Sequence, residues 1–84
     1  MSYQIDLETR AKKELTTLPR DIQLKIHAVL EDLRRNPRPP GCKKLTGYDG
    51  YRIRQGAYRV VYTISDQAKK ILVYRIGHRK DVYR

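Results

Sequence analysis

The chain has one cysteine, no phenylalanine or tryptophan, and no long apolar run. Cys42 therefore has no partner for a disulfide within the chain, and it is typical of a reducing compartment. No stretch approaches the roughly 18 apolar residues that a membrane span needs, and residues 1–6 contain no signal-like apolar segment. No paired His, Asp or Glu set suggests a metal, and no glycine-rich phosphate loop precedes a helix. We expect a cytoplasmic protein that uses no metal or other cofactor and does not contact a membrane.

Acidic residues are also scarce, because 19 Lys and Arg face 9 Asp and Glu, for a formal net charge of +10. The charge is uneven: residues 1–33 carry 5 basic and 6 acidic side chains, whereas residues 34–84 carry 14 basic and 3 acidic ones. Charge concentrated in one half predicts a nucleic-acid partner, or an acidic protein that covers the same surface. The alternative is the ordinary basic surface of a soluble protein.

The first half of the chain predicts a short strand and two helices. Residues 3–6 alternate as a strand does, and Asp6 is placed to cap the helix that follows. The apolar residues of that helix are Leu7, Ala11, Leu15 and Leu18. Pro19 fits the first turn of a second helix. Its apolar stripe is Ile22, Ile26, Val29, Leu30 and Leu33, and the helix should end near Arg35 because prolines follow.

After Cys42 the pattern changes to the alternation of strands, which we expect at residues 43–46, 51–54, 58–65 and 70–77. With Gln55-Gly56 as a two-residue turn, Arg52 lies opposite Arg59, and Arg52, Arg54 and Arg59 share one face of the hairpin. The other face is apolar and suits the helices: Tyr51, Ile53, Tyr58, Val60, Tyr62 and Ile64. The predicted fold is α+β, a single domain of residues 1–84 with two N-terminal helices on one face of a small, mainly antiparallel twisted sheet.

Three arginines on one face repel one another, and an anion such as phosphate relieves that repulsion through their guanidinium forks. Arginine cannot serve as a general base, since its pKa lies above 12. A phosphodiester-cleaving site would therefore need His78, Arg79 and Tyr83 from the C-terminal tail, with His78 or Tyr83 as the base. The alternative is that His78 and Tyr83 only pack the terminus or bind RNA.

The sequence predicts structural roles for the other histidine and for three of the seven tyrosines. His27 lies beside the apolar stripe of the second helix, and Tyr51, Tyr58 and Tyr62 fall on the apolar face of the hairpin. The remaining candidates for stacking on nucleobases are Tyr48, Tyr74 and Tyr83.

Several motifs together resemble the RelE/ParE toxin superfamily, on its RelE side: Lys44-Leu-Thr-Gly47, Tyr51-Arg-Ile-Arg54, Gly56-Ala-Tyr-Arg-Val-Val-Tyr62 and Ile76-Gly-His-Arg-Lys-Asp-Val-Tyr83. The resemblance covers nearly the whole chain. It implies a RelE-like fold and the toxin of a type II toxin–antitoxin pair, which cuts mRNA in the ribosomal A site without a metal. It also implies two partners, an acidic cognate antitoxin and the ribosome with its 16S rRNA.

The resemblance further implies roles for individual residues. Arg52 and Arg54 would hold the phosphate backbone, together with Lys43 and Lys44 as further substrate-binding residues. The residues assigned to the cleavage step are Arg59 on the scissile phosphate, Arg79 on the developing charge, Tyr83 on the substrate nucleotide, and His78. The best-known RelE has lysines where this chain has Arg52 and Arg54, so a mechanism with lysine as the base does not apply here, and the base would be Tyr83 or His78.

Two other functions fit the same sequence. One is a ParE-like gyrase inhibitor, since one fold can support both activities. The other is an RNA-binding module without catalysis, which would share the salt-dependent binding of the enzyme but leave RNA intact.

Overall fold

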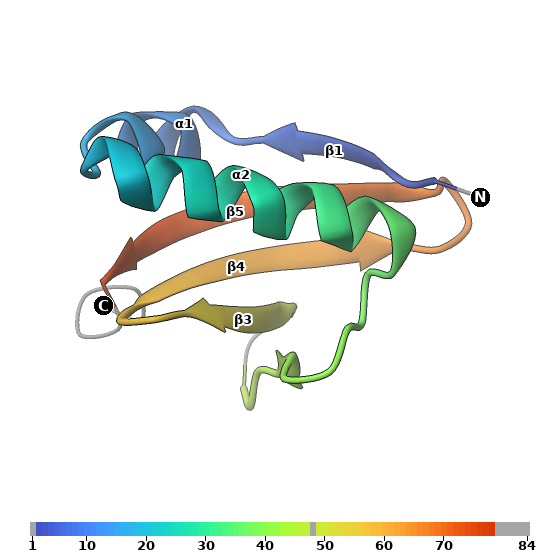
Figure 1. The fold of residues 1–84 in the computed structure, drawn as a ribbon. Coiled ribbons are helices and arrows are strands. Elements are labelled where there is room, and N and C mark those ends of the chain that lie inside the picture. The colour runs from blue at the N-terminus through green and yellow to red at the C-terminus, as the bar shows by residue number, and fades with distance from the viewer. Residues whose placement is uncertain (1, 48, 79–84) are drawn as a thin grey trace.

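The computed structural model describes residues 2–47 and 49–78, which form two helices beside a five-stranded sheet (Figure 1). The elements in chain order are β1 (Gln4–Leu7), α1 (Thr9–Thr16), α2 (Arg20–Arg35), β2 (Lys43–Lys44), β3 (Tyr51–Gln55), β4 (Tyr58–Ser65) and β5 (Lys70–His78). The sheet order is β1-β5-β4-β3-β2. Of the four strand pairs in the described part of the chain, only β1–β5 is parallel, so the sheet is mainly antiparallel as expected. The predicted fold class is confirmed.

The two helices form close to where the sequence predicts them, but both begin differently. Asp6 does not cap α1, because it remains in β1 and the helix follows Glu8, which is extended and makes no side-chain cap. The Glu8 N–H instead donates to the Val73 carbonyl at 2.8 Å, which keeps the chain in the sheet for longer. Pro19 is the residue before α2 rather than its first residue. The end of α2 at Arg35 agrees with the prediction.

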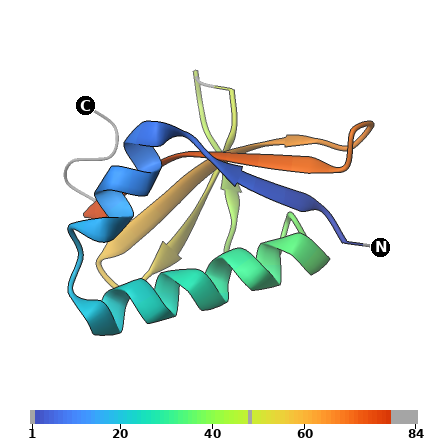
Figure 2. The same ribbon diagram turned by 90° about the horizontal axis from the view of Figure 1, so that it is seen from above.

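α2 lies along one face of the twisted sheet, and α1 lies beside β1 and β5 (Figure 2). The core between the helices and the sheet is made of Ala11, Leu15, Ile26, Leu30, Leu33, Val60, Tyr62, Ile71, Val73 and Ile76. Tyr51, Ile53, Tyr58 and Ile64 pack against it, so all six residues predicted for the apolar face of the hairpin lie on that face. We call the opposite side of the sheet, turned away from α2, the open face.

An irregularity in the β4–β5 pair changes which β5 side chains reach the open face. Val61 lies opposite Arg75 and Tyr62 opposite Val73, so Tyr74 is an extra residue on β5. Such a bulge adds one residue to one strand and shifts its alternation. Ile71 and Val73 therefore point to the core before it, Ile76 does so after it, and Arg75 belongs to the open face.

The side chain of Tyr74 leaves room only for glycine at position 50, just before β3. The Tyr74 hydroxyl donates to the Asp49 carbonyl at 3.0 Å. A Cβ built on Gly50 would lie 2.9 Å from that hydroxyl oxygen and 2.7 Å from the Tyr62 carbonyl oxygen, and Gly50 has a φ of +134°. Only glycine fits this close approach without strain.

Candidate nucleic-acid interface and active site

The β3–β4 hairpin turns one residue later than predicted. Its turn is Gly56-Ala57, because Gln55 pairs with Tyr58 and Arg54 pairs with Arg59. Gly56 has a φ of +61° in the first turn position, where a type II′ hairpin turn places glycine. The predicted turn was wrong because it put this glycine second.

The corrected register preserves the predicted face. Moving the turn by one residue moves the partner of each β3 residue by two, and residues two apart in a strand share a face. Arg52, Arg54 and Arg59 therefore lie on the open face together, with Arg54 directly opposite Arg59 and Arg52 opposite Val61. Arg54 is exposed, whereas Arg52 and Arg59 are half-buried.

The short strand β2 contributes one of the two predicted lysines to the same surface. Lys43 lies opposite Arg52 and so shares the open face, whereas Lys44 lies opposite Tyr51 and shares the face that carries the core. We call Lys43, Arg52, Arg54 and Arg59 the basic row. It crosses three adjacent strands, which is the arrangement that a chain of phosphates needs.

His78 lies on the other side of the sheet. It is the last residue of β5 and pairs with Tyr58, and the two rings meet edge to face with centroids 5.9 Å apart. Gly77, which precedes it, is the residue opposite Arg59. The structure therefore does not bring His78 onto the face of the basic row. Arg79 and Tyr83 lie outside the described residues.

Sequence reasoning missed a carboxylate that reaches the edge of this surface. Glu14 of α1 accepts a hydrogen bond from the Ile76 backbone N–H at 2.9 Å and pairs with Arg75 Nε at 3.1 Å. The position of Glu14 within α1 gave no sign of this role, because its partners Arg75 and Ile76 lie 61 and 62 positions later in the sequence.

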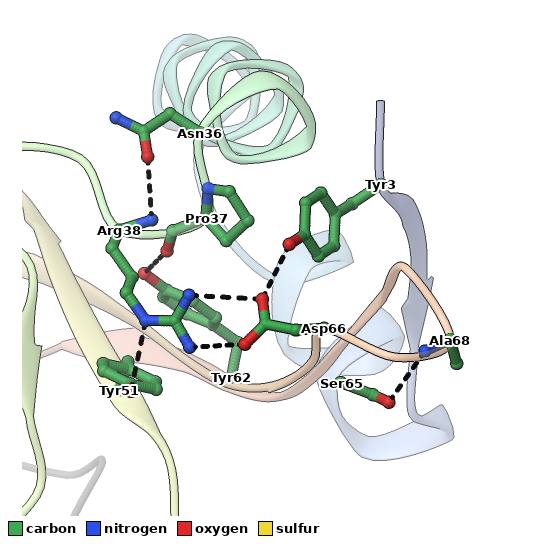
Figure 3. A network of polar contacts seen from close by, with 9 residues as sticks. All are labelled: Tyr3, Asn36, Pro37, Arg38, Tyr51, Tyr62, Ser65, Asp66 and Ala68. Atoms are coloured by element: carbon green, nitrogen blue, oxygen red, sulfur yellow. Dashed lines mark hydrogen bonds and ion pairs between the residues drawn. The ribbon is translucent and has the colours of Figure 1, made fainter. Parts of the chain in front are cut away.

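A second polar cluster, also unforeseen, lies at the other end of β4 (Figure 3). Arg38 pairs with both carboxylate oxygens of Asp66, at 3.3 and 3.0 Å, and its Nε donates to the Tyr51 hydroxyl at 3.3 Å. The Tyr3 hydroxyl donates to Asp66 at 2.6 Å. Arg38 and Tyr3 together lower the pKa of Asp66 to about 2, and Asp66 raises the pKa of Arg38 above its usual value.

Tyr62 connects this cluster to the core. Its hydroxyl donates to the Pro37 carbonyl at 2.7 Å, and its ring stacks on Tyr51 with centroids 6.0 Å apart. Burial raises the pKa of this hydroxyl, so Tyr62 stays protonated and remains a donor. These contacts join the segment after α2 to β3, β4 and the β4–β5 turn, and Tyr3, just before β1, bonds to the same turn. The burial of Tyr62 in the core and the packing of Tyr51 against it confirm the packing roles predicted for both.

A pocket among the described residues lies away from the basic row. It holds about 500 Å³ between β1 and α2, and its lining includes Ile5, Leu7, His27, Leu30 and Arg34. His27 is exposed there. None of the four residues of the basic row lines this pocket.

Comparison with known proteins agrees with this architecture. A family model described as "ParE toxin of type II toxin-antitoxin system, parDE" matches residues 5–83. The toxin RelG of Mycobacterium tuberculosis is 32% identical over 88 residues, which cover 100% of this chain and 99% of that protein. The chain belongs to the RelE/ParE toxin family.

Other relatives carry RelE names. The mRNA interferase toxin RelE of Escherichia coli K12 is 29% identical to this chain, over 95% of this chain and 86% of that protein. The toxin–antitoxin complex RelBE2 of M. tuberculosis contains a chain with a TM-score of 0.84 and 28% identity, aligned over 94% of this chain and 100% of that one. The protein is thus a RelE-like toxin of the type II toxin–antitoxin class in sequence and in fold.

Two kinds of feature are absent from the described residues. No helix within residues 2–47 and 49–78 is long and apolar enough to cross a membrane. In the same ranges, no group of three His, Cys, Asp or Glu side chains is placed to hold a metal ion.

Proposed function

We propose that this toxin is a ribosome-dependent, metal-independent endoribonuclease that cleaves mRNA in the A site and so stops translation. The observation that carries the proposal is the basic row, with Arg54 directly opposite Arg59 on the open face. Like charges placed opposite each other destabilise a sheet, and an RNA backbone supplies the negative charge that offsets this cost. The name of the E. coli relative, an mRNA interferase, supports the same activity.

RNA carries its own nucleophile, the 2′-OH. The protein therefore needs only to orient that hydroxyl, stabilise the charge on the phosphorane, and transfer protons to and from the reacting oxygens. Attack by the 2′-OH on the adjacent phosphorus forms a P–O2′ bond, breaks the P–O5′ bond and leaves a cyclic phosphate. Lys43, Arg52 and Arg54 would hold the backbone in line for this attack. Arg59 and Arg79 would stabilise the charge on the phosphorane, and Arg79 would also assist protonation of the departing 5′ oxygen.

The proton of the 2′-OH must pass to a base that is not an arginine. Histidine and tyrosine side chains can both accept a proton, so His78 and Tyr83 are the candidates. The pairing of His78 with Tyr58, on the core side of the sheet, favours Tyr83 as the base. Nearby cations would lower the pKa of a tyrosine in that role. Lys44, also on the core side of its strand, would contact RNA only at the margin of the site.

An acidic antitoxin is the partner that we propose for this surface. Residues 34–84 carry a net charge of +11, which would attract a negatively charged segment that folds on binding. The M. tuberculosis structure that resembles this chain is a toxin–antitoxin complex, which supports such a partner. The ribosome, with its 16S rRNA, is the second anionic partner, and the cytoplasm is where it would be met.

The test is an in vitro translation reaction programmed with one mRNA, in which cleavage is mapped by primer extension. We expect wild-type protein to cut ribosome-bound mRNA with EDTA-stripped toxin as well as with untreated toxin. Arg59→Gln and Arg79→Gln should each lower the cleavage rate by about 10²- to 10³-fold, as loss of one charge-stabilising donor does. Unimpaired cleavage by both variants would overturn the site.

Lys25→Gln is the matched control, since Lys25 is exposed on α2, away from the open face, and its loss removes the same charge. It should cleave like wild type. His78→Gln should retain more activity than Tyr83→Phe if Tyr83 is the base.

The family model is named for ParE, so gyrase inhibition is the second candidate. A DNA supercoiling assay with purified gyrase separates the two functions. If the toxin inhibits supercoiling by gyrase and leaves mRNA intact, the endoribonuclease proposal is wrong and gyrase inhibition takes its place. Tight RNA binding without either effect would leave a non-catalytic RNA-binding module.

A further inference from the structure

Glu14 occupies the position where the edge of the sheet loses its outer strand. β1 pairs with β5 only as far as Leu7 and Val73, so β5 continues for five more residues without β1 beside it. The Glu14 carboxylate fills the first part of this gap by accepting from the Ile76 N–H at 2.9 Å. A backbone donor at a sheet edge needs an acceptor, and a side chain from α1 supplies it here.

The same carboxylate also holds an arginine. Arg75 Nε lies 3.1 Å from Glu14 Oε2, and the two side chains are only 12% and 24% exposed. Charge-assisted hydrogen bonds in such a sheltered position are stronger and better ordered than exposed ion pairs. By contrast, Arg10 lies 4.0 Å from the same carboxylate with 63% of its side chain exposed.

Arg75 lies beside the basic row. It is opposite Val61 on β4, whereas Arg59 is opposite Gly77, so Arg75 and Arg59 are diagonal neighbours on the open face. Diagonal neighbours are about 7–8 Å apart at their Cα atoms, a distance that successive phosphates of one RNA strand can bridge. Gly77 has no side chain that could stand between them.

The two contacts of Glu14 make different demands on its chemistry. Capping the Ile76 N–H requires an acceptor oxygen, which glutamine would provide equally well. Fixing the plane of a guanidinium through its Nε–H draws on the negative charge, which glutamine lacks. A carboxylate near an RNA surface also repels phosphate, so a charge retained there must act through a cation that it orients.

We propose that Arg75 is a further phosphate-binding residue of the open face, and that Glu14 is its positioning residue. The inference deepens the proposed function, on which it rests, by assigning a second arginine pair, Arg59 and Arg75, to neighbouring phosphates of the RNA. Glu14 touches neither phosphate and acts only through Arg75.

The test measures binding of a short single-stranded 2′-O-methyl RNA, which cannot be cleaved, over a range of salt concentrations. Loss of one phosphate contact lowers the slope of log K against log salt by about 0.7 for a single strand. We expect this change for Arg75→Gln and none for Arg10→Gln, which removes the other arginine that pairs with Glu14. If Arg75→Gln has a much lower melting temperature than wild type, the binding assay is repeated with Arg75→Lys. That variant should keep the wild-type salt slope while binding the RNA less tightly.

Glu14→Gln distinguishes positioning from simple charge. Removing a negative charge near RNA should tighten binding if charge alone matters, and should weaken binding if Arg75 loses its orientation. We therefore expect Glu14→Gln to weaken binding severalfold in the wild-type background and to tighten it in the Arg75→Gln background. Tightening in both backgrounds, or equal slopes for Arg75→Gln and Arg10→Gln, would overturn the inference.

This experiment is independent of cleavage. Wild-type protein that leaves ribosome-bound mRNA intact would refute the endoribonuclease proposal, while the salt slopes would still decide the role of Arg75. Conversely, cleavage that depends on Arg59 with an unchanged slope for Arg75→Gln would refute only the role of Arg75.

Discussion

The direct pairing of Arg54 with Arg59 predicts that the basic row weakens the fold that carries it. Replacing Arg54 with glutamine should raise the melting temperature while it lowers RNA cleavage, because the two guanidinium groups repel each other when no anion lies between them. A functional surface that costs stability is common in enzymes.

The size of the effect follows from the register. Like charges directly opposite in a sheet cost about 0.2–1 kcal/mol, and in a domain of this size each kcal/mol shifts the melting temperature by about 4–8 °C. The expected gain is therefore about 1–8 °C at low salt. Arg54 is exposed, so the lower half of that range applies, and the gain should shrink as the Debye length falls from about 30 Å at 0.01 M salt to 3 Å at 1 M.

A double-mutant cycle isolates this pair from the general repulsion of a chain with a charge of +10. Arg54→Gln and Arg59→Gln should be non-additive, since removing either arginine already relieves the repulsion. The matched cycle of Arg52→Gln with Arg59→Gln should show weaker coupling, because Arg52 lies opposite Val61. Melting curves at low and high salt measure both. Stronger coupling in the Arg52 cycle, or none in the Arg54 cycle at low salt, would refute the register and the reasoning built on it.

Three further predictions concern the scaffold. Tyr62→Phe should cost about 1–3 kcal/mol in the free energy of unfolding, measured by urea denaturation, because it leaves the Pro37 carbonyl without its buried donor. Gly50→Ala should cost at least about 1–3 kcal/mol in the same assay, since φ is +134° and the new Cβ would lie 2.7 Å from a backbone oxygen. Asp66 has a pKa lowered to about 2, so its ionised form contributes stability above about pH 4, and this is lost as the pH falls towards 2. The melting temperature of wild type should therefore exceed that of Asp66→Asn at pH 6, and the two should converge near pH 2. A stable Tyr62→Phe or Gly50→Ala, or a gap at Asp66 that persists to pH 2, would contradict the corresponding contacts.

Periodicity was enough to predict α2, β3, β4 and β5 to within about one residue, because each has a clear apolar face. The first helix is two residues shorter at each end than its apolar residues Leu7 to Leu18 predicted, and the strand predicted at residues 43–46 ends at Lys44. Periodicity failed at Asp6, where a backbone hydrogen bond from Glu8 to Val73 continues the strand past a good capping residue. Local capping preference is worth about 1 kcal/mol, and a sheet contact from a distant residue can outweigh it. The same limit applies to Arg38 and Asp66, which lie 28 residues apart and meet only in the folded chain.

By itself, the sequence determined that Arg52, Arg54 and Arg59 share a face, because alternation along a strand has a period of two and is unaffected when pairing shifts by two residues. Tertiary structure alone decided what surrounds them. The bulge at Tyr74 gives Arg75 to the open face, the short β1 leaves an edge that Glu14 fills, and the pairing of His78 with Tyr58 places that histidine on the core side. Each of these depends on one strand lying beside a distant segment, and pairing between distant segments is set by packing of the whole domain rather than by local pattern.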